Sequence, residues 1–231
     1  MMKNFLVRLI MALLFICCAF GLTALAQTTG TPANNSVQPP KKSNERPAAS
    51  AAAKPEPFDG ATVEKMAAQC VTLETEAGSI LIEMLAETAP ETARNFLNLA
   101  ATGAFDTTTF NRTVKGFVIQ GGHLATRPSL TPELAARSAR SLIDEPNPVK
   151  HVRGIVSMAR SDQPNSAKTS FFILVGNGSH LDGKFAAFGR VLSGMDVVDA
   201  INQAPAEGDK PSKPVRLTRA VVAPCPATPA Q

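Results

Sequence analysis

The chain has 231 residues, enough for one domain of ordinary size with extensions, and carries 23 Lys and Arg residues against 19 Asp and Glu. The net charge of +4 is too small for a nucleic-acid-binding surface, and the longest basic run is the pair at 41–42. Its three histidines are isolated from one another and from the cysteines, so the sequence does not predict a metal site.

The first 26 residues have the pattern of an export signal. Lys3 and Arg8 give a positive start, residues 9–25 are almost wholly apolar, and the run A-L-A at 24–26 fits the small-x-small cleavage pattern. We therefore expect cleavage after Ala26 and no contact with the membrane afterwards. The alternative is a segment retained as a membrane anchor.

The next segment differs sharply in composition from a folded domain. Residues 27–57 are rich in Thr, Pro, Ala, Ser, Asn and Lys, with few large apolar side chains. Such a segment buries too little surface to offset the entropy cost of ordering. We expect a disordered tether over 27–68 with a short helix near its end, then a folded domain over 69–225 and a flexible tail over 226–231.

The domain begins with signals for a hairpin and a helix. Residues 71–76 and 79–84 flank an Ala-Gly turn and alternate as strands do. Thr88 and Glu91 have the spacing of a capping box, an apolar stripe follows, and Gly103 stands where a helix would end. Further short strands are expected at 107–112, 117–120, 155–159, 171–175, 185–191 and 215–222, with helices at 132–140 and 195–202. Many short strands with few helices favour a closed or nearly closed β architecture.

Cys70 and Cys225 are the cysteines that remain after export, and they flank the expected domain. In an oxidising compartment they either form a disulfide that clasps the two ends of the domain or remain free thiols. The residues alone leave both alternatives open.

Residues 110–122, F-N-R-T-V-K-G-F-V-I-Q-G-G, mix features that one strand seldom combines. A core strand does not need Arg112 or Gln120, and a surface strand does not need two phenylalanines. By spacing alone, the run fits a mixed edge strand with an arginine in solvent.

This run resembles the F-H-R-x-x-x-G-F-x-x-Q-G-G signature of the cyclophilin peptidyl-prolyl isomerases. Four further segments are similar to that family in the same order: T-A-P-E-T-A-R-N-F, G-I-V-S-M-A-R-S-D-Q-P-N-S-A-K-T-S-F-F-I, L-D-G-K-F-A-A-F-G-R-V-L-S-G-M-D-V-V and P-S-K-P-V-R-L. The likeness covers about residues 70–223, and the wording M-A-R-S…N-S-A resembles the exported bacterial branch. It implies a mainly β fold, a closed eight-stranded antiparallel β-barrel capped by two α-helices.

The resemblance also implies an activity, peptidyl-prolyl cis–trans isomerisation without a cofactor. The substrates would be proline-containing segments of unfolded or exported proteins. Arg112 would stabilise the nitrogen lone pair that appears when amide resonance is lost, and Gln120 would hold Arg112 and orient the substrate carbonyl. The pocket for the proline ring would consist of Phe117, Val118, Met158, Phe172 and Leu181, and the backbone at Ala159 and Arg160 would bind the peptide.

Four positions depart from the family's usual residues. Asn111 replaces a histidine, Ser170 a glutamine, His180 an aromatic residue that is often tryptophan, and Phe185 a frequent histidine. Asn111, Ser170 and His180 are therefore included among the substrate-binding positions, with altered contacts. We expect a monomer with activity, reduced or changed in substrate preference, and weak cyclosporin binding. The alternatives are a module that binds proline peptides with little or no turnover, and an unrelated exported β-barrel with an enclosed cavity.

Two further expectations depend on the resemblance. Residues 111–113 form an N-glycosylation sequon, and a glycan there would fill the groove, which favours a bacterial periplasm over a eukaryotic secretory pathway. A protein secreted from the cell remains the alternative location. The family's barrel also places its first and last strands together, which favours a Cys70–Cys225 disulfide.

Overall fold

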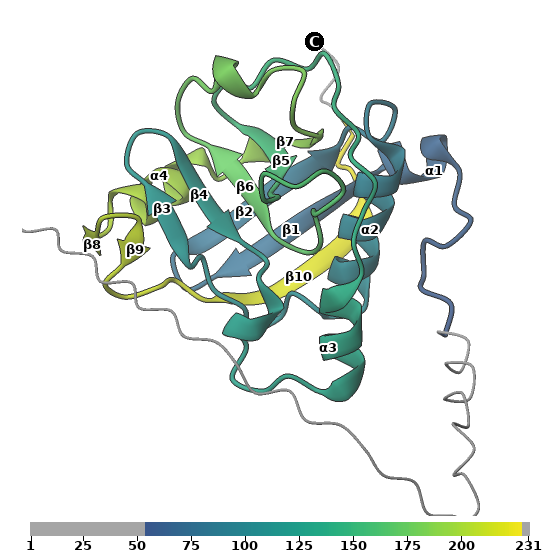
Figure 1. Cartoon of the computed structure of the whole chain (residues 1–231), viewed down its shortest axis with the longest axis horizontal. Helices are drawn as coiled ribbons and strands as arrows, with labels where there is room; N and C mark the ends of the chain where they lie inside the picture. The colour runs from purple at the N-terminus through teal and green to yellow at the C-terminus, as the bar shows by residue number, and fades with distance from the viewer. Residues whose placement is uncertain (1–53, 228–231) are drawn as a thin grey trace, which may run out of the picture. The chain divides into compact units, whose positions relative to one another are not determined.

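The computed structural model describes residues 54–227, and the strands and helices of this part form one compact unit (Figure 1). The expected export signal, residues 27–53 of the expected tether and the last residues of the tail lie outside the described residues. Within residues 54–227, no helix is both long and apolar enough to span a bilayer.

Eight strands form one curled antiparallel sheet in the order β10-β1-β2-β7-β5-β6-β4-β3. Their bounds are β1 Gln69–Thr75, β2 Gly78–Met84, β3 Arg112–Val114, β4 Val118–Gly121, β5 Ile155–Met158, β6 Phe171–Leu174, β7 Ala187–Ser193 and β10 Leu217–Pro224. A separate two-stranded hairpin joins β8 Ala206–Glu207 to β9 Lys210–Pro211. The helices are α1 Val63–Ala67, α2 Pro90–Ala101, α3 Pro132–Ala139 and α4 Met195–Gln203, with 3₁₀ turns at Leu124–Thr126 and Ser179–Leu181.

The sheet is a half-barrel rather than the closed barrel expected. Its edge strands β3 and β10 are not joined by a ladder, and the chain segments before them meet at one bridge, Thr109 with Arg216. The reason lies at β3, which is only three residues long. There the N–H of Thr113 donates to the carbonyl of Asp209 at 2.9 Å, so the β8–β9 hairpin takes a bond that a closing strand would need.

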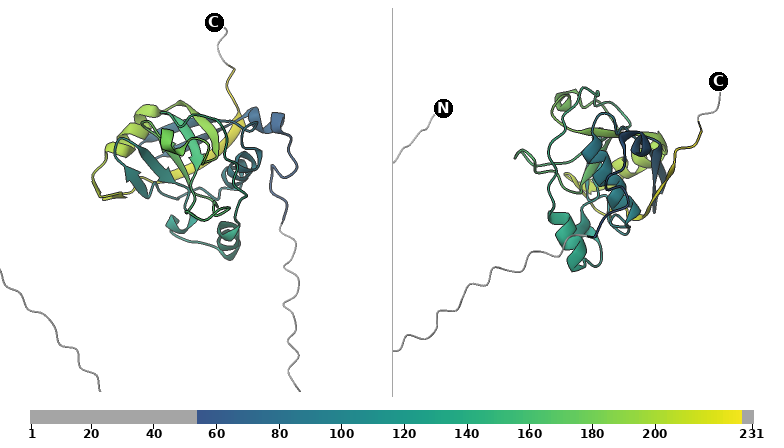
Figure 2. Two further views of the ribbon diagram at one scale, coloured as in Figure 1. Left: turned by 45° about the horizontal axis from the view of Figure 1, so that its top comes forward. Right: turned by 90° about the vertical axis from the view of Figure 1, so that its right-hand side faces the viewer.

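Helices α2 and α4 lie at opposite ends of the curled sheet, as the views in Figures 1 and 2 show. The ring of Phe96 on α2 packs 4.9 Å from Phe188 and 5.2 Å from Phe171, and all three side chains are fully buried. Aromatic pairs at these separations are favourable beyond the area they bury. The main core is therefore an aromatic cluster between α2 and the sheet.

The start of α2 differs from the expected capping box. The helix begins at Pro90, and the side chain of Thr88 donates to the carbonyl of Leu85 instead of capping it. The carboxylate of Glu145 accepts from the backbone N–H groups of Glu91 at 3.1 Å and Thr92 at 2.7 Å. A residue 53 positions away along the chain thus supplies the negative charge that a helix N-terminus favours.

Residues 54–68, expected to belong to the tether, pack against the domain. Helix α1 forms within this segment, and the side chains of Phe58 and Met66 are buried in the main core. Arg94 of α2 donates to the carbonyls of Phe58 at 2.7 Å and Ala61 at 2.8 Å. Two large apolar side chains in a polar segment suffice to dock it, which average composition does not reveal.

A disulfide joins the two ends of the domain. Strand β1 pairs with β10 from Gln69↔Pro224 to Thr75↔Leu217, and this register places Cys70 opposite Ala223. Cys225 follows Pro224, the last residue of β10. Its N–H donates to the carbonyl of Ala68, and its sulfur is bonded to that of Cys70 with a Cα–Cα distance of 4.8 Å.

Candidate active site

A row of three side chains crosses the strands β3, β4 and β6. Their registers place Arg112 opposite Gln120 and Gln120 opposite Phe172. Directly opposed residues of antiparallel strands project from the same face of a sheet. The half-barrel therefore aligns a cation, an amide and an aromatic ring, although Arg112 and Phe172 lie 60 positions apart in the sequence.

This row forms one side of a small pocket of about 150 Å³. Its walls comprise eight of the predicted residues and one more: Arg112, Phe117, Val118, Gln120, Ala159, Arg160, Phe172, Leu181 and Phe185. Val118 and Phe172 are nearly fully buried and belong to a small apolar cluster separate from the main core. Pockets for drug-sized ligands have about 300–1,000 Å³, so this one suits a single small side chain.

Arg112 has a partner that the sequence did not predict. Its Nη2 lies 2.8 Å from Oδ2 of Asp209, in the turn between β8 and β9. Within residues 54–227, no hydrogen bond joins the side chains of Arg112 and Gln120, so the expected role of Gln120 in holding Arg112 is not seen here. The sequence around Asp209, E-G-D-K, indicates a turn, but nothing in it points to a residue 97 positions away.

Phe185 is the pocket residue that was noted only as a departure from the family's usual histidine. Its ring meets that of Phe172 at 76° with 6.0 Å between centroids, and the guanidinium of Arg160 lies 4.7 Å from the Phe185 centroid. Arg160 also donates to the carbonyls of Ser161 and Lys184. An arginine held over an aromatic face is a favourable cation–π arrangement, so this pair forms a fixed wall of the pocket.

Met158 was expected in the pocket, and the structure corrects this expectation. Strand residues alternate between the two faces of a sheet. Ser157 is paired with Phe172 beside the pocket, and Met158 is buried in the main core.

Three other predicted positions lie around the pocket without lining it. His180 packs on Phe117 with 5.2 Å between ring centroids. Asn111 donates its backbone N–H to the carbonyl of Gln120, while its buried side-chain oxygen has no hydrogen-bond partner in the described structure. Ser170 faces a neighbouring hollow, and its carbonyl accepts from the N–H of Ala159. The backbone at Ala159 and Arg160 was expected to bind the peptide, but the N–H of Ala159 therefore already has a hydrogen-bond partner.

Residues 70–222 match the family model for cyclophilin type peptidyl-prolyl cis-trans isomerases. The chain belongs to this family. It is 38% identical over 156 residues to peptidyl-prolyl cis-trans isomerase cypE of Dictyostelium discoideum, covering 67% of this chain and 98% of that protein. It is 41% identical over 143 residues to peptidyl-prolyl cis-trans isomerase-like 3 of Rhizopus delemar, covering 59% and 84%.

Solved structures agree with this assignment. A cyclophilin type peptidyl-prolyl cis-trans isomerase of Cryptosporidium parvum has a TM-score of 0.60 and 28% identity, covering 68% of this chain and 99% of that one. A cyclophilin of Hirschia baltica has a TM-score of 0.55 and 25% identity, covering 66% and 73%. The protein is a peptidyl-prolyl cis–trans isomerase of the cyclophilin type, a kind of enzyme that needs no cofactor. The side chains of residues 54–227 include no cluster of three or more His, Cys, Asp or Glu placed to hold a metal ion.

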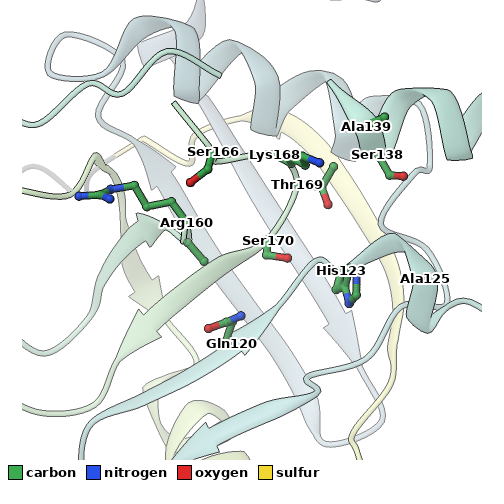
Figure 3. Close-up of a pocket in the computed structure, with 11 residues that line it drawn as sticks. Gln120, His123, Ala125, Ser138, Ala139, Arg160, Ser166, Lys168, Thr169 and Ser170 are labelled. Atoms are coloured by element: carbon green, nitrogen blue, oxygen red, sulfur yellow. The ribbon is translucent and has the colours of Figure 1, made fainter. Parts of the chain in front are cut away.

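A second hollow of about 480 Å³ adjoins the small pocket of this cyclophilin and shares Gln120, Ala159 and Arg160 with it. Its other lining residues are His123, Ala125, Ser138, Ala139, Ser166, Lys168, Thr169 and Ser170. In Figure 3, Ser166, Lys168 and Thr169 lie along the loop that leads into β6, above Gln120 and Ser170. The side chain of Asn95 on α2 donates to the carbonyl of Lys168 at 3.0 Å and so fixes this loop.

A buried histidine connects strand β5 to the segment that follows the 3₁₀ turn at Ser179–Leu181. Nδ1 of His151 lies 3.2 Å from Oδ1 of Asp182, and Nε2 lies 3.1 Å from the hydroxyl of Ser157. Desolvation lowers the pKa of His151 more than Asp182 raises it, and the backbone N–H of His151 lowers the pKa of Asp182. Ser157 is fully buried and lies 2.8 Å from the carbonyl of Ala186, so this Asp-His-Ser set cannot reach a substrate and is no nucleophilic triad.

Proposed function

We propose that this cyclophilin accelerates the isomerisation of X–Pro bonds in exported proteins, with the small pocket as its active site. The supporting observation is that Arg112 lines the same 150 Å³ pocket as the apolar side chains of Phe117 and Phe172. The proline ring occupies the apolar end of the pocket. Arg112 then lies at the rim, where the nitrogen of that ring is exposed.

The physical reason for catalysis follows from the barrier. Rotation of a peptide bond loses amide resonance and costs about 18–20 kcal/mol, and uncatalysed X–Pro exchange takes tens to hundreds of seconds. At the top of the barrier, the proline nitrogen regains a localised lone pair. A guanidinium N–H of Arg112 donates to that lone pair, an interaction stronger in the transition state than in the ground state. Gln120, beside Arg112 on the same face, receives the substrate carbonyl with its amide.

A related structure supports proline dipeptides as ligands. One of the similar solved structures is that of the Cryptosporidium parvum cyclophilin in the presence of the dipeptide Ala-Pro. Its TM-score is 0.59 and its identity 28%. We infer the same class of ligand for the small pocket here. The packing of His180 against Phe117 also supports weak cyclosporin binding, because the smaller ring offers less surface than the family's tryptophan.

The second hollow adds a preference for the residues that flank the proline. It shares its boundary residues Gln120, Ala159 and Arg160 with the small pocket, so a bound peptide reaches both. Lys168 is exposed and forms no ion pair within residues 54–227. A free ammonium group attracts carboxylates, so we infer that substrates with an acidic residue next to the X–Pro pair are preferred.

The cellular compartment of the enzyme is inferred from its N-terminal segment and from its disulfide. The export pattern of residues 1–26 and the disulfide between Cys70 and Cys225 both suit an oxidising compartment. We propose the bacterial periplasm, where the protein acts as a monomer on proline-containing segments of unfolded proteins. Intact mass of the protein from a periplasmic fraction tests this: the expected chain begins at Gln27, and a chain that keeps residues 1–26 would contradict cleavage.

A protease-coupled assay with a proline peptide tests the catalytic role of Arg112. We expect Arg112→Ala to lower kcat/KM by about 100-fold, as loss of one donor to a developing charge does in other enzymes. Arg153→Ala is the matched control, because Arg153 has similar exposure and pairs with Asp199 outside both pockets. Equal rates for Arg112→Ala and wild type would refute the role of Arg112. A wild-type rate at background level would favour a module that binds without turnover.

A further inference from the structure

The β8–β9 hairpin is attached to the active-site strand by two contacts from one residue. The carbonyl of Asp209 accepts from the N–H of Thr113 at 2.9 Å, and its carboxylate lies 2.8 Å from Nη2 of Arg112. Thr113 and Arg112 are neighbours on β3. The tip of the hairpin therefore holds the arginine through the backbone of β3 as well as through its side chain.

Arg112 needs such an anchor. Its side chain is 43% exposed, and a free arginine side chain must lose much of its rotamer freedom before it can point in one direction. Gln120 shares its face of the sheet but makes no hydrogen bond to it among the contacts within residues 54–227. Asp209 is the carboxylate that pairs with it there.

The pair leaves the donors needed for the reaction unused. Asp209 engages Nη2, so Nε and Nη1 of Arg112 retain N–H groups for a substrate. The guanidinium is planar, and fixing one nitrogen therefore restricts the direction of the other two. Asp209 itself does not line the pocket, so it acts on the substrate only through Arg112.

We propose that Asp209 is a positioning residue for isomerisation, which orients the guanidinium of Arg112 toward the proline nitrogen. The proposal rests on the proposed role of Arg112. It makes the β8–β9 hairpin, which lies outside the main sheet, a part of the active site. Pairing with Asp209 partly neutralises the positive charge of Arg112, but the better alignment of the remaining N–H donors has the larger effect on the rate.

Kinetics with Asp209→Ala provide the first test. An exposed ion pair contributes little free energy, so we expect the exchange rate of a bound proline peptide, followed by NMR, to fall about two- to five-fold. The Kd of the peptide should hardly change, and Asp209→Glu should restore most of the rate. In an Arg112→Ala background, Asp209→Ala should have no further effect. Glu207→Ala, on the same hairpin and without a contact to Arg112 among the described ion pairs, is the matched control.

The Nε–Hε NMR signal of Arg112 provides a second test that does not need turnover. Its order parameter should drop in Asp209→Ala and remain at the wild-type value in Glu207→Ala. If wild type shows no turnover, the proposed function fails while this signal still reports on the pair. The positioning role is overturned if the order parameter is unchanged in Asp209→Ala. It is also overturned if the exchange rate is unchanged or rises, or if Glu207→Ala lowers the rate equally.

Discussion

Opening the Cys70–Cys225 disulfide should lower the stability of the domain by a large and calculable amount. The bond closes a loop of 155 residues. In the chain-entropy model, a loop of this length removes enough freedom from the unfolded chain to stabilise the folded state by about 5 kcal/mol. The folded state itself should change little, because β1 and β10 remain paired from Gln69↔Pro224 to Thr75↔Leu217. We therefore expect a reduced protein that folds normally but unfolds much more easily.

Urea unfolding followed by far-UV circular dichroism measures this difference, since the chain has no Trp or Tyr for intrinsic fluorescence. The reduced protein should lose about 5 kcal/mol and show a larger m-value, because its unfolded chain is free to expand. Cys225→Ser without reductant should behave as the reduced protein does. Equal midpoints with and without reductant, with no two-hydrogen difference in intact mass, would refute the reasoning by showing that the bond is absent.

Three further predictions concern buried and charged groups. Burial lowers the pKa of His151 below its ordinary value of 6.5, so the unfolded chain binds a proton first as the pH falls. The free energy of unfolding should therefore decline from pH 6.5 down to the lower pKa that His151 has in the folded state, and then level off. His151→Gln should lack this part of the decline. Plots of urea midpoint against pH that run parallel for the variant and the wild type would contradict the prediction. Arg137→Ala should cost about 2 kcal/mol, because Arg137 and Glu56 form a 2.6 Å pair that is mostly buried, whereas Arg140→Ala, which removes a longer contact to Glu56, should cost less in urea unfolding. Lys168→Glu should reverse the preference between peptides with an acidic and a basic residue beside the X–Pro pair, and an unchanged ratio of kcat/KM values would exclude the second hollow as the source of that preference.

The family and most of the pocket residues could be predicted from the sequence. The signature run from Phe110 to Gly122 and the four further matching segments indicated the family, and eight of the pocket residues follow from that resemblance. Local secondary structure could also be predicted, from short-range patterns. The alternation along β1 and β2 and the helix before Gly103 are encoded within about a dozen neighbouring residues, where side-chain period and turn chemistry act directly.

The burial of individual side chains was predicted less accurately. Met158 was assigned to the pocket by resemblance to the family, whereas strand alternation puts Ser157 beside Phe172 and directs Met158 into the main core. Residues 54–68 were included in the tether because polar composition up to residue 57 and only a short helix were expected there, although Phe58 and Met66 are buried in the core. In both cases the burial of individual side chains decided the outcome.

The sequence by itself determined the family, the order of most strands and helices, and most of the residues that line the small pocket. Only the tertiary structure decided that the sheet remains a half-barrel, that Glu145 caps α2, and that Asp209 holds Arg112. Each of these depends on a charged or polar group from a distant loop. Such groups carry no periodic signal, and their partners are chosen by the geometry in which the loops finally meet.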